Sequence, residues 1–67
     1  METKINNKLK YYREKMKLTQ ENVADTLSIA VSTYNQFERN RRKVSLIKAK
    51  ELSIVFNTTI EELFFTK

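Results

Sequence analysis

Apolar residues recur every three or four positions in five short stretches of the chain, and polar residues separate these stretches. This spacing places the apolar side chains of each stretch on one face of an α-helix. The pattern predicts helices over about residues 4–17, 20–27, 31–39 and 45–56, with a short fifth helix after Thr59. We therefore expect an all-α fold, arranged as a compact five-helix bundle.

Each predicted helix has a set of residues expected to face the core. The inward-facing residues expected in chain order are Ile5, Leu9, Tyr12 and Met16; Val23, Ala24 and Leu27; Tyr34 and Phe37; Leu46, Ala49, Leu52 and Phe56; and Ile60, Leu63 and Phe64.

Polar residues mark several of the predicted helix boundaries. Thr19, Ser45 and Thr59 stand where a side-chain oxygen can accept a backbone N–H of the first helical turn. Asn22 occupies the position after Thr19 where a capping box would have Glu or Gln, so we expect the box to be incomplete. Asn40 is the residue best suited to a left-handed conformation in the loop after the third helix.

Residues 20–39 contain two predicted short helices separated by about three residues. Ala24 stands where the two helices would cross, and its small side chain allows a close approach. Ile29 is placed to fill the turn from beneath. This arrangement is typical of a helix-turn-helix, in which the second helix enters the major groove of DNA.

Composition narrows the possible functions. The 67 residues suffice for one domain, expected over residues 1–67, and include no Gly, Pro, Cys or His. Without turn residues a hairpin-based sheet is disfavoured, and without Cys or His we expect no metal site, no cofactor and no enzymatic activity. The longest apolar runs are three residues, so we expect no membrane segment, no secretion signal and a cytoplasmic location.

Charge is distributed unevenly along the chain. The net charge is +5, and residues 39–50 carry six basic residues and no acidic one. A second basic stretch covers residues 4–17, whereas residues 51–67 have a net charge of −2. Two basic stretches and an acidic end indicate one side of the molecule that faces a polyanion such as DNA.

Four short segments together resemble a known family. They are Leu18-Thr19-Gln20-Glu21-Asn22-Val23-Ala24, Leu27-Ser28-Ile29, Ser32-Thr33-Tyr34 and Phe37-Glu38-Arg39-Asn40. In this order and spacing they resemble the Cro/repressor-type (Xre-like) helix-turn-helix domain of phage and bacterial regulators, over about residues 7–64. The resemblance implies the phage-repressor fold, with the second and third helices forming the motif. It also implies a transcriptional regulator, favoured as a repressor, that binds a palindromic operator as a dimer with its third helix in the major groove.

The resemblance also implies roles for individual residues. Gln20 is expected to bond a DNA phosphate, and Arg13 and Glu38 to form a structural ion pair between the first and third helices. The residues expected to contact bases are Val31, Ser32, Thr33, Asn35 and Gln36. The residues expected along the phosphates, besides Gln20, are Asn40, Arg41, Arg42 and Lys43. The side-chain amides of Asn35 and Gln36 have the paired donor and acceptor that match adenine.

The sequence departs from the family pattern at several positions. The family commonly has Gly where Ser28 and Asn40 stand, and Pro is frequent where Val44 stands. If the backbone at Ser28 requires a positive φ, we expect a cost of about 1 kcal/mol there. Tyr34 is larger than the Ile or Val usual at its position, so the packing around it must differ.

The C-terminal part of the chain has more apolar residues than a small core can bury. Phe64 and Phe65 are adjacent and cannot both point inward from one helix. We therefore expect a homodimer surface within residues 54–67, formed by Ile54, Val55, Phe64 and Phe65. The alternative function is a protein-interaction module, an antitoxin or a partner of an anti-repressor, that uses the same fold as a scaffold. We expect double-stranded DNA as the partner, and neither a membrane nor a small-molecule ligand.

Overall fold

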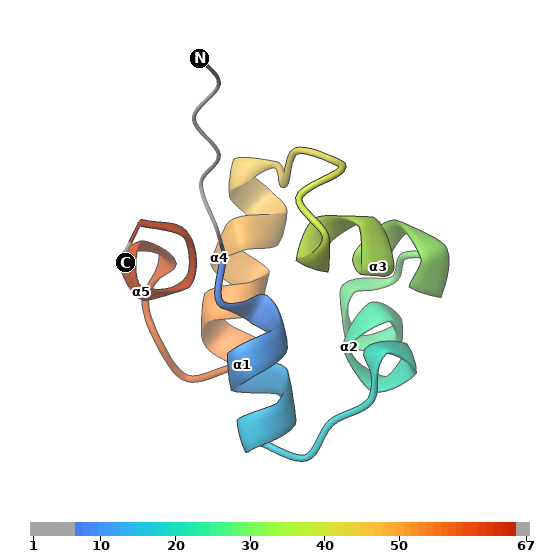
Figure 1. The fold of residues 1–67 in the computed structure, drawn as a ribbon, viewed down its shortest axis with the longest axis horizontal. Coiled ribbons are helices and arrows are strands. Elements are labelled where there is room, and N and C mark those ends of the chain that lie inside the picture. The colour runs from blue at the N-terminus through green and yellow to red at the C-terminus, as the bar shows by residue number, and fades with distance from the viewer. Residues whose placement is uncertain (1–6, 66–67) are drawn as a thin grey trace.

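The computed structural model describes residues 7–65, and these residues form five α-helices and no strand. The helices are α1 (Leu9–Lys15), α2 (Gln20–Leu27), α3 (Val31–Glu38), α4 (Leu46–Val55) and α5 (Ile60–Phe64). In Figure 1, α2 and α3 lie side by side at one end of the molecule and α5 lies at the other, with α1 and α4 between them. The prediction of an all-α, five-helix fold is confirmed.

A single apolar core joins the five helices. Leu9 of α1, Leu52 of α4 and Leu63 of α5 are fully buried in the same cluster as the inward faces of α2 and α3. The members of this cluster are Leu9, Val23, Ala24, Leu27, Tyr34, Phe37, Leu52, Phe56 and Leu63. Because every helix contributes to it, the short helices stabilise one another through packing.

The first helix is shorter than predicted. It begins at Leu9, whose backbone N–H donates to the Oδ1 atom of Asn7 at 3.1 Å. It stops at Lys15, and Lys17 has a positive φ of 59°. Met16 was expected inward but is 43% exposed, because it follows the last helical residue. The predicted start near Lys4 and the inward residue Ile5 lie outside the described residues.

The inward face of α4 also differs from the prediction at one residue. Ala49, Leu52 and Phe56 are buried as expected, but Leu46 is 77% exposed. Leu46 is the first residue of α4 and lines an open groove between the α3–α4 loop and α5, so no neighbouring helix covers it. The core instead takes in Ser53, whose Oγ donates to the carbonyl of Lys50 at 2.6 Å.

Helices α1 to α4 all end with the same backbone motif. A residue with a positive φ follows each helix, and the next N–H donates to a carbonyl five residues earlier, which satisfies a free carbonyl of the last turn. The residues with positive φ are Lys17, Ser28, Asn40 and Asn57. The corresponding bonds run from Leu18 to Arg13, Ile29 to Ala24, Arg41 to Gln36 and Thr58 to Ser53. The left-handed conformation predicted for Asn40 is confirmed, and Ser28 does adopt the positive φ considered from the sequence.

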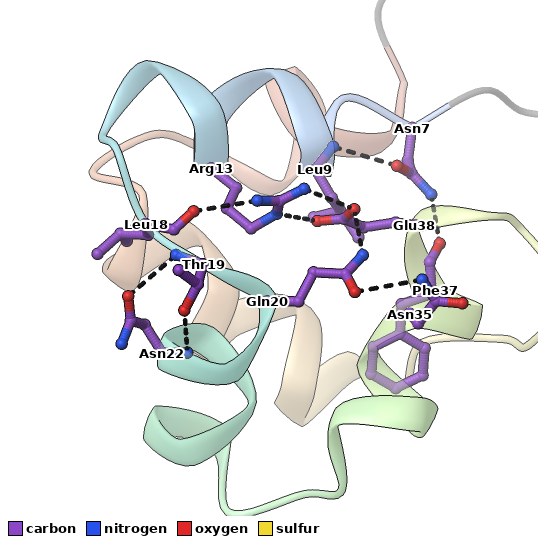
Figure 2. Close-up of polar contacts among 10 residues, drawn as sticks. All are labelled: Asn7, Leu9, Arg13, Leu18, Thr19, Gln20, Asn22, Asn35, Phe37 and Glu38. Atoms are coloured by element: carbon purple, nitrogen blue, oxygen red, sulfur yellow. Dashed lines mark hydrogen bonds and ion pairs between the residues drawn. The ribbon is translucent and has the colours of Figure 1, made fainter.

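The start of α2 has a complete capping box, so the prediction of an incomplete one is wrong. The Thr19 side chain accepts the N–H of Asn22 at 3.0 Å, and the Asn22 side chain accepts the N–H of Thr19 at 2.9 Å (Figure 2). The amide oxygen of Asn22 reaches the same backbone N–H that a Glu would reach in the usual box.

Helices α2 and α3 are held close together. Ala24 of α2 is buried in the same core cluster as Tyr34 and Phe37 of α3, and Ile29 packs partly on this core from the turn. Lys48 reaches from α4 and donates to the carbonyl of Leu27, at the end of α2, at 2.8 Å. This hydrogen bond links the α2–α3 pair to α4.

No helix within residues 7–65 is long and apolar enough to cross a membrane.

Candidate nucleic-acid interface

One face of α3 is buried and the other is open. Tyr34 and Phe37 are buried and their rings meet edge to face, with centroids 6.3 Å apart, which anchors the helix. On the outer side Val31, Ser32 and Gln36 are exposed, whereas Thr33 and Asn35 are half-buried. All five residues expected to contact bases therefore lie on one short helix, but two of them are partly covered.

A basic loop continues from the end of α3. Its residues Arg39, Asn40, Arg41, Arg42 and Lys43 are all exposed, and Val44 packs partly on the core. Four of these exposed residues carry a positive charge, so the loop extends the outer face of α3 with an electropositive edge.

Asn7 holds the basic loop in place, a role that the sequence analysis did not find. Its Nδ2 donates to the carbonyl of Phe37 at 2.7 Å (Figure 2) and also to Oδ1 of Asn40 at 2.9 Å. A single side chain thus joins the start of α1 to the end of α3. A lone Asn before a helix gives no sequence pattern that would reveal this partner thirty residues away.

Arg13 and Glu38 form an ion pair between α1 and α3. The Nε of Arg13 donates to Oε2 of Glu38 at 2.6 Å and its Nη2 to Oε1 at 3.3 Å. The two side chains are only 12% and 4% exposed, respectively. Because the carboxylate is nearly buried, its negative charge is stabilised by the hydrogen bonds that it accepts and not by water.

The ion pair continues into a chain of amide hydrogen bonds. Gln20 Nε2 donates to Glu38 Oε1 at 3.0 Å, and Asn35 Nδ2 donates to Gln20 Oε1 at 3.2 Å (Figure 2). Arg13 also donates through Nη1 to the carbonyl of Leu18 at 3.0 Å. Gln20 was expected to bond a DNA phosphate. In the structure both ends of its side-chain amide, Nε2 and Oε1, form hydrogen bonds with other residues of the protein. Its Nε2 group retains one further N–H.

The environment of Glu38 shifts the pKa values of three groups. Burial alone would raise the pKa of Glu38, but the Arg13 guanidinium, the nearby Tyr34 hydroxyl and the Gln20 amide together outweigh burial and hold this pKa below its ordinary value. The hydrogen bond to Glu38 raises the pKa of Arg13. Burial, with the nearby Glu38 carboxylate, raises the pKa of Tyr34, whose hydroxyl makes no hydrogen bond of standard geometry within residues 7–65.

The four residues expected to form a dimer surface are not equally exposed. Ile54 and Phe65 are exposed, whereas Val55 and Phe64 pack partly on the core. Phe64 and Phe65 line the open groove of about 640 Å³ beside the basic loop, but Ile54 and Val55 do not. The structure also exposes Tyr11 and Ile47, which the sequence analysis did not single out, and Leu46, which it expected to face inward.

Among residues 7–65, no three His, Cys, Asp or Glu side chains gather where they could hold a metal ion. What the described surface offers is a short exposed polar helix beside a basic loop. Such a combination suits a groove of nucleic acid flanked by phosphates.

Known proteins with similar sequences include a transcriptional regulator and a control protein. The family model described as helix-turn-helix matches residues 9–63. An uncharacterized HTH-type transcriptional regulator of Methanocaldococcus jannaschii is 37% identical over 60 residues, which cover 90% of this chain and 91% of that protein. The control protein C.MunI of a Mycoplasma species is 36% identical over 62 residues, or 91% of this chain and 84% of that protein.

Proposed function

This chain belongs to the Cro/repressor-type helix-turn-helix family of DNA-binding transcriptional regulators, and from this premise we propose that it is a repressor that reads its operator with α3. The family is one of regulators and not of enzymes. The observation that carries the proposal is the division of α3 into a buried aromatic face and an exposed polar face next to a basic loop.

The outer face of α3 supplies the base contacts in this proposal. Gln36 is exposed, and its side-chain amide can pair with the N7 and N6 atoms of adenine. Val31 is exposed at the start of the helix, where its methyl groups suit the methyl group of thymine. Ser32 and Thr33 supply hydroxyl groups for a base or a phosphate, and Asn35 supplies a second amide.

Phosphate contacts would position α3 in the groove. Arg41, Arg42 and Lys43 lie exposed in the basic loop beside Asn40, and Gln20 retains an N–H at the start of α2. These contacts would supply most of the non-specific affinity, because each neutralised phosphate releases bound counterions.

A homodimer fits this mode of binding. Two copies related by a two-fold axis would place their α3 helices about 34 Å apart, in successive major grooves of a palindromic operator. Exposed Ile54 and Phe65, with the half-buried Val55 and Phe64, would form the contact between copies. Bound over a promoter in the cytoplasm, such a dimer would exclude polymerase and repress transcription.

Selection of bound duplexes from a random DNA library tests the proposal. We expect a palindrome, and we expect Gln36→Ala to relax the preference at one base pair per half-site at a cost of about 1–3 kcal/mol. Arg41→Ala serves as the matched phosphate variant: it should weaken binding to all sequences alike and flatten the dependence of log K on log salt by about one. Weak binding to duplex with little salt dependence would instead favour the protein-interaction module.

A further inference from the structure

The hydrogen bonds around Glu38 have only one possible direction. Its carboxylate is nearly buried and is kept ionised by Arg13, so both of its oxygens can only accept. Gln20 meets the carboxylate at 3.0 Å and must therefore present its Nε2 group. Because the two ends of an amide differ, the Oε1 atom of Gln20 must then face the opposite way.

The same constraint passes to α3. Gln20 Oε1 lies 3.2 Å from the side-chain amide of Asn35, and an oxygen there can only accept. Asn35 must therefore turn its Nδ2 group toward Gln20. Figure 2 shows Gln20 between Glu38 on one side and Asn35 on the other. The buried ion pair thus determines the rotation of an amide on the helix that is proposed to read bases.

We propose that Gln20 and Glu38 are positioning residues that set the base preference at one operator position, by fixing which end of the Asn35 amide is offered to the base. This inference rests on the proposed function, because it requires α3 to read DNA. With Nδ2 held toward Gln20, its second N–H and the Oδ1 atom stay available as a donor and an acceptor in a defined order. That order suits adenine, which accepts at N7 and donates at N6.

Without the hydrogen bond to Gln20, the amide of Asn35 can rotate by half a turn about its last side-chain bond. The rotated amide would place Oδ1 of Asn35 opposite N7 of adenine. Both atoms are hydrogen-bond acceptors, so the match to adenine would be lost. Specificity at this position therefore depends on three side chains from α2 and α3, although only Asn35 touches the base.

The test variant is Gln20→Met, which keeps the length of the side chain and removes both amide hydrogen bonds. The base pair read by residue 35 is first identified with Asn35→Ala on a panel of duplexes that differ at single positions. At that pair, Gln20→Met should lower the ratio of affinities between the preferred base and the next best by about threefold to tenfold. Since Gln20 is also proposed to bond a phosphate, all affinities should fall by a common factor, which cancels in the ratio.

A double variant separates positioning from other roles. In the Asn35→Ala background, Gln20→Met should leave the ratio at this pair unchanged, because the side chain through which Gln20 acts is missing. Arg41→Ala is the matched control for loss of a phosphate contact, and it should lower all affinities and leave every ratio as it is. Thermal unfolding of each variant establishes that it is folded at the assay temperature.

Glu38→Gln provides a second test if Gln20→Met does not fold. An amide at residue 38 can donate to Gln20, which permits Gln20 and Asn35 both to rotate, so the preference should change at the same pair and no other. The inference is overturned if Gln20→Met leaves the affinity ratio unchanged in the wild-type background. It is also overturned if Gln20→Met lowers this ratio by the same factor in the wild-type and the Asn35→Ala backgrounds. If the unmodified protein shows no base preference at all, the proposed function itself fails, and this result is distinct from either outcome.

Discussion

Left-handed backbone conformations end helices α1 to α4 in a chain that contains no glycine. Asn tolerates this conformation because its short polar side chain can bond locally, which suits Asn40 and Asn57. Ser28 and Lys17 have no such advantage, and each costs about 1–2 kcal/mol relative to an unstrained position. The local conformation is maintained because it lets the chain turn into the next helix.

Replacing Ser28 should therefore stabilise the protein. We expect Ser28→Gly to raise the free energy of unfolding by about 1 kcal/mol, and the midpoint of thermal unfolding by about 4–8 °C. Ser32→Gly is the matched control: Ser32 is exposed within α3, where Gly should destabilise by about 0.5–1 kcal/mol. The opposite signs expected for Ser→Gly at these two residues test the role of φ, and a loss of stability in Ser28→Gly would contradict it.

Glu38 couples the stability of the fold to pH. Its pKa in the folded protein is below the ordinary value of 4.5, because Arg13, with Tyr34 and Gln20, stabilises the carboxylate by more than burial destabilises it. The ionised carboxylate therefore stabilises the fold fully at pH values well above 4.5. This contribution is lost as the pH falls through the depressed pKa of the folded state.

The pH dependence can be measured by urea denaturation between neutral pH and pH 3. The free energy of unfolding should fall with pH below about 4.5 in the unmodified protein and fall less steeply in Glu38→Gln. Glu14→Gln alters an exposed carboxylate of α1 and is the matched control. Identical slopes for Glu38→Gln and the unmodified protein would show that Glu38 has no part in the acid sensitivity.

At the scale of the elements, the contact between α2 and α3 depends on the small side chain of Ala24. This residue is buried in the core that the two helices share, and the backbone N–H of Ile29, in the turn between them, donates to the Ala24 carbonyl at 3.0 Å. A larger side chain would have to push the helices apart or distort the turn. The angle at which α3 is presented therefore depends on residue 24.

We expect Ala24→Leu to lower the free energy of unfolding by about 1–3 kcal/mol. Ala30→Leu places the same side chain on an exposed residue of the same motif and should change stability by no more than about 0.5 kcal/mol. The free energies of unfolding of both variants are measured by chemical denaturation and compared with that of the unmodified protein. Similar stabilities for the two would contradict tight packing at the crossing.

At the scale of the whole molecule, one of the two exposed apolar side chains proposed for the dimer, Phe65, lines the groove beside the basic loop, and the other, Ile54, does not. The basic loop and the outer face of α3 adjoin one another, whereas exposed Ile54 belongs to α4 and exposed Phe65 follows α5. These exposed side chains supply apolar surface for a second copy, in keeping with the proposed dimer, and Phe65 brings that surface to the edge of the basic loop.

Replacing the two exposed apolar side chains of the proposed dimer surface, Ile54 and Phe65, tests that dimer. Ile54→Ser combined with Phe65→Ser should shift the protein toward monomer in sedimentation at micromolar concentration, and should weaken binding to a palindrome more than to a single half-site. Tyr11→Ser removes an exposed aromatic side chain from α1 and is the control. Unchanged sedimentation of the double variant would place any dimer contact elsewhere.

Much of the fold follows from local chemistry and could be predicted from the sequence. The periodicity of Val23, Leu27, Tyr34 and Phe37 identified two of the helices and their buried faces, because an α-helix repeats every 3.6 residues whatever surrounds it. The exposure of a basic loop at Arg41 also follows from a run of charges that no core could bury. The family was evident for the same reason, since its motif lies in one continuous stretch.

Only the tertiary structure decided what depends on distant residues. The exposure of Leu46 depends on whether another helix covers the first turn of α4, and the role of Asn7 depends on a carbonyl thirty residues away. The direction of the Asn35 amide depends on Glu38 through Gln20, a link between α2 and α3 that no local pattern encodes. Periodicity states which way a side chain points from its own helix, whereas its partners are determined by how the helices pack.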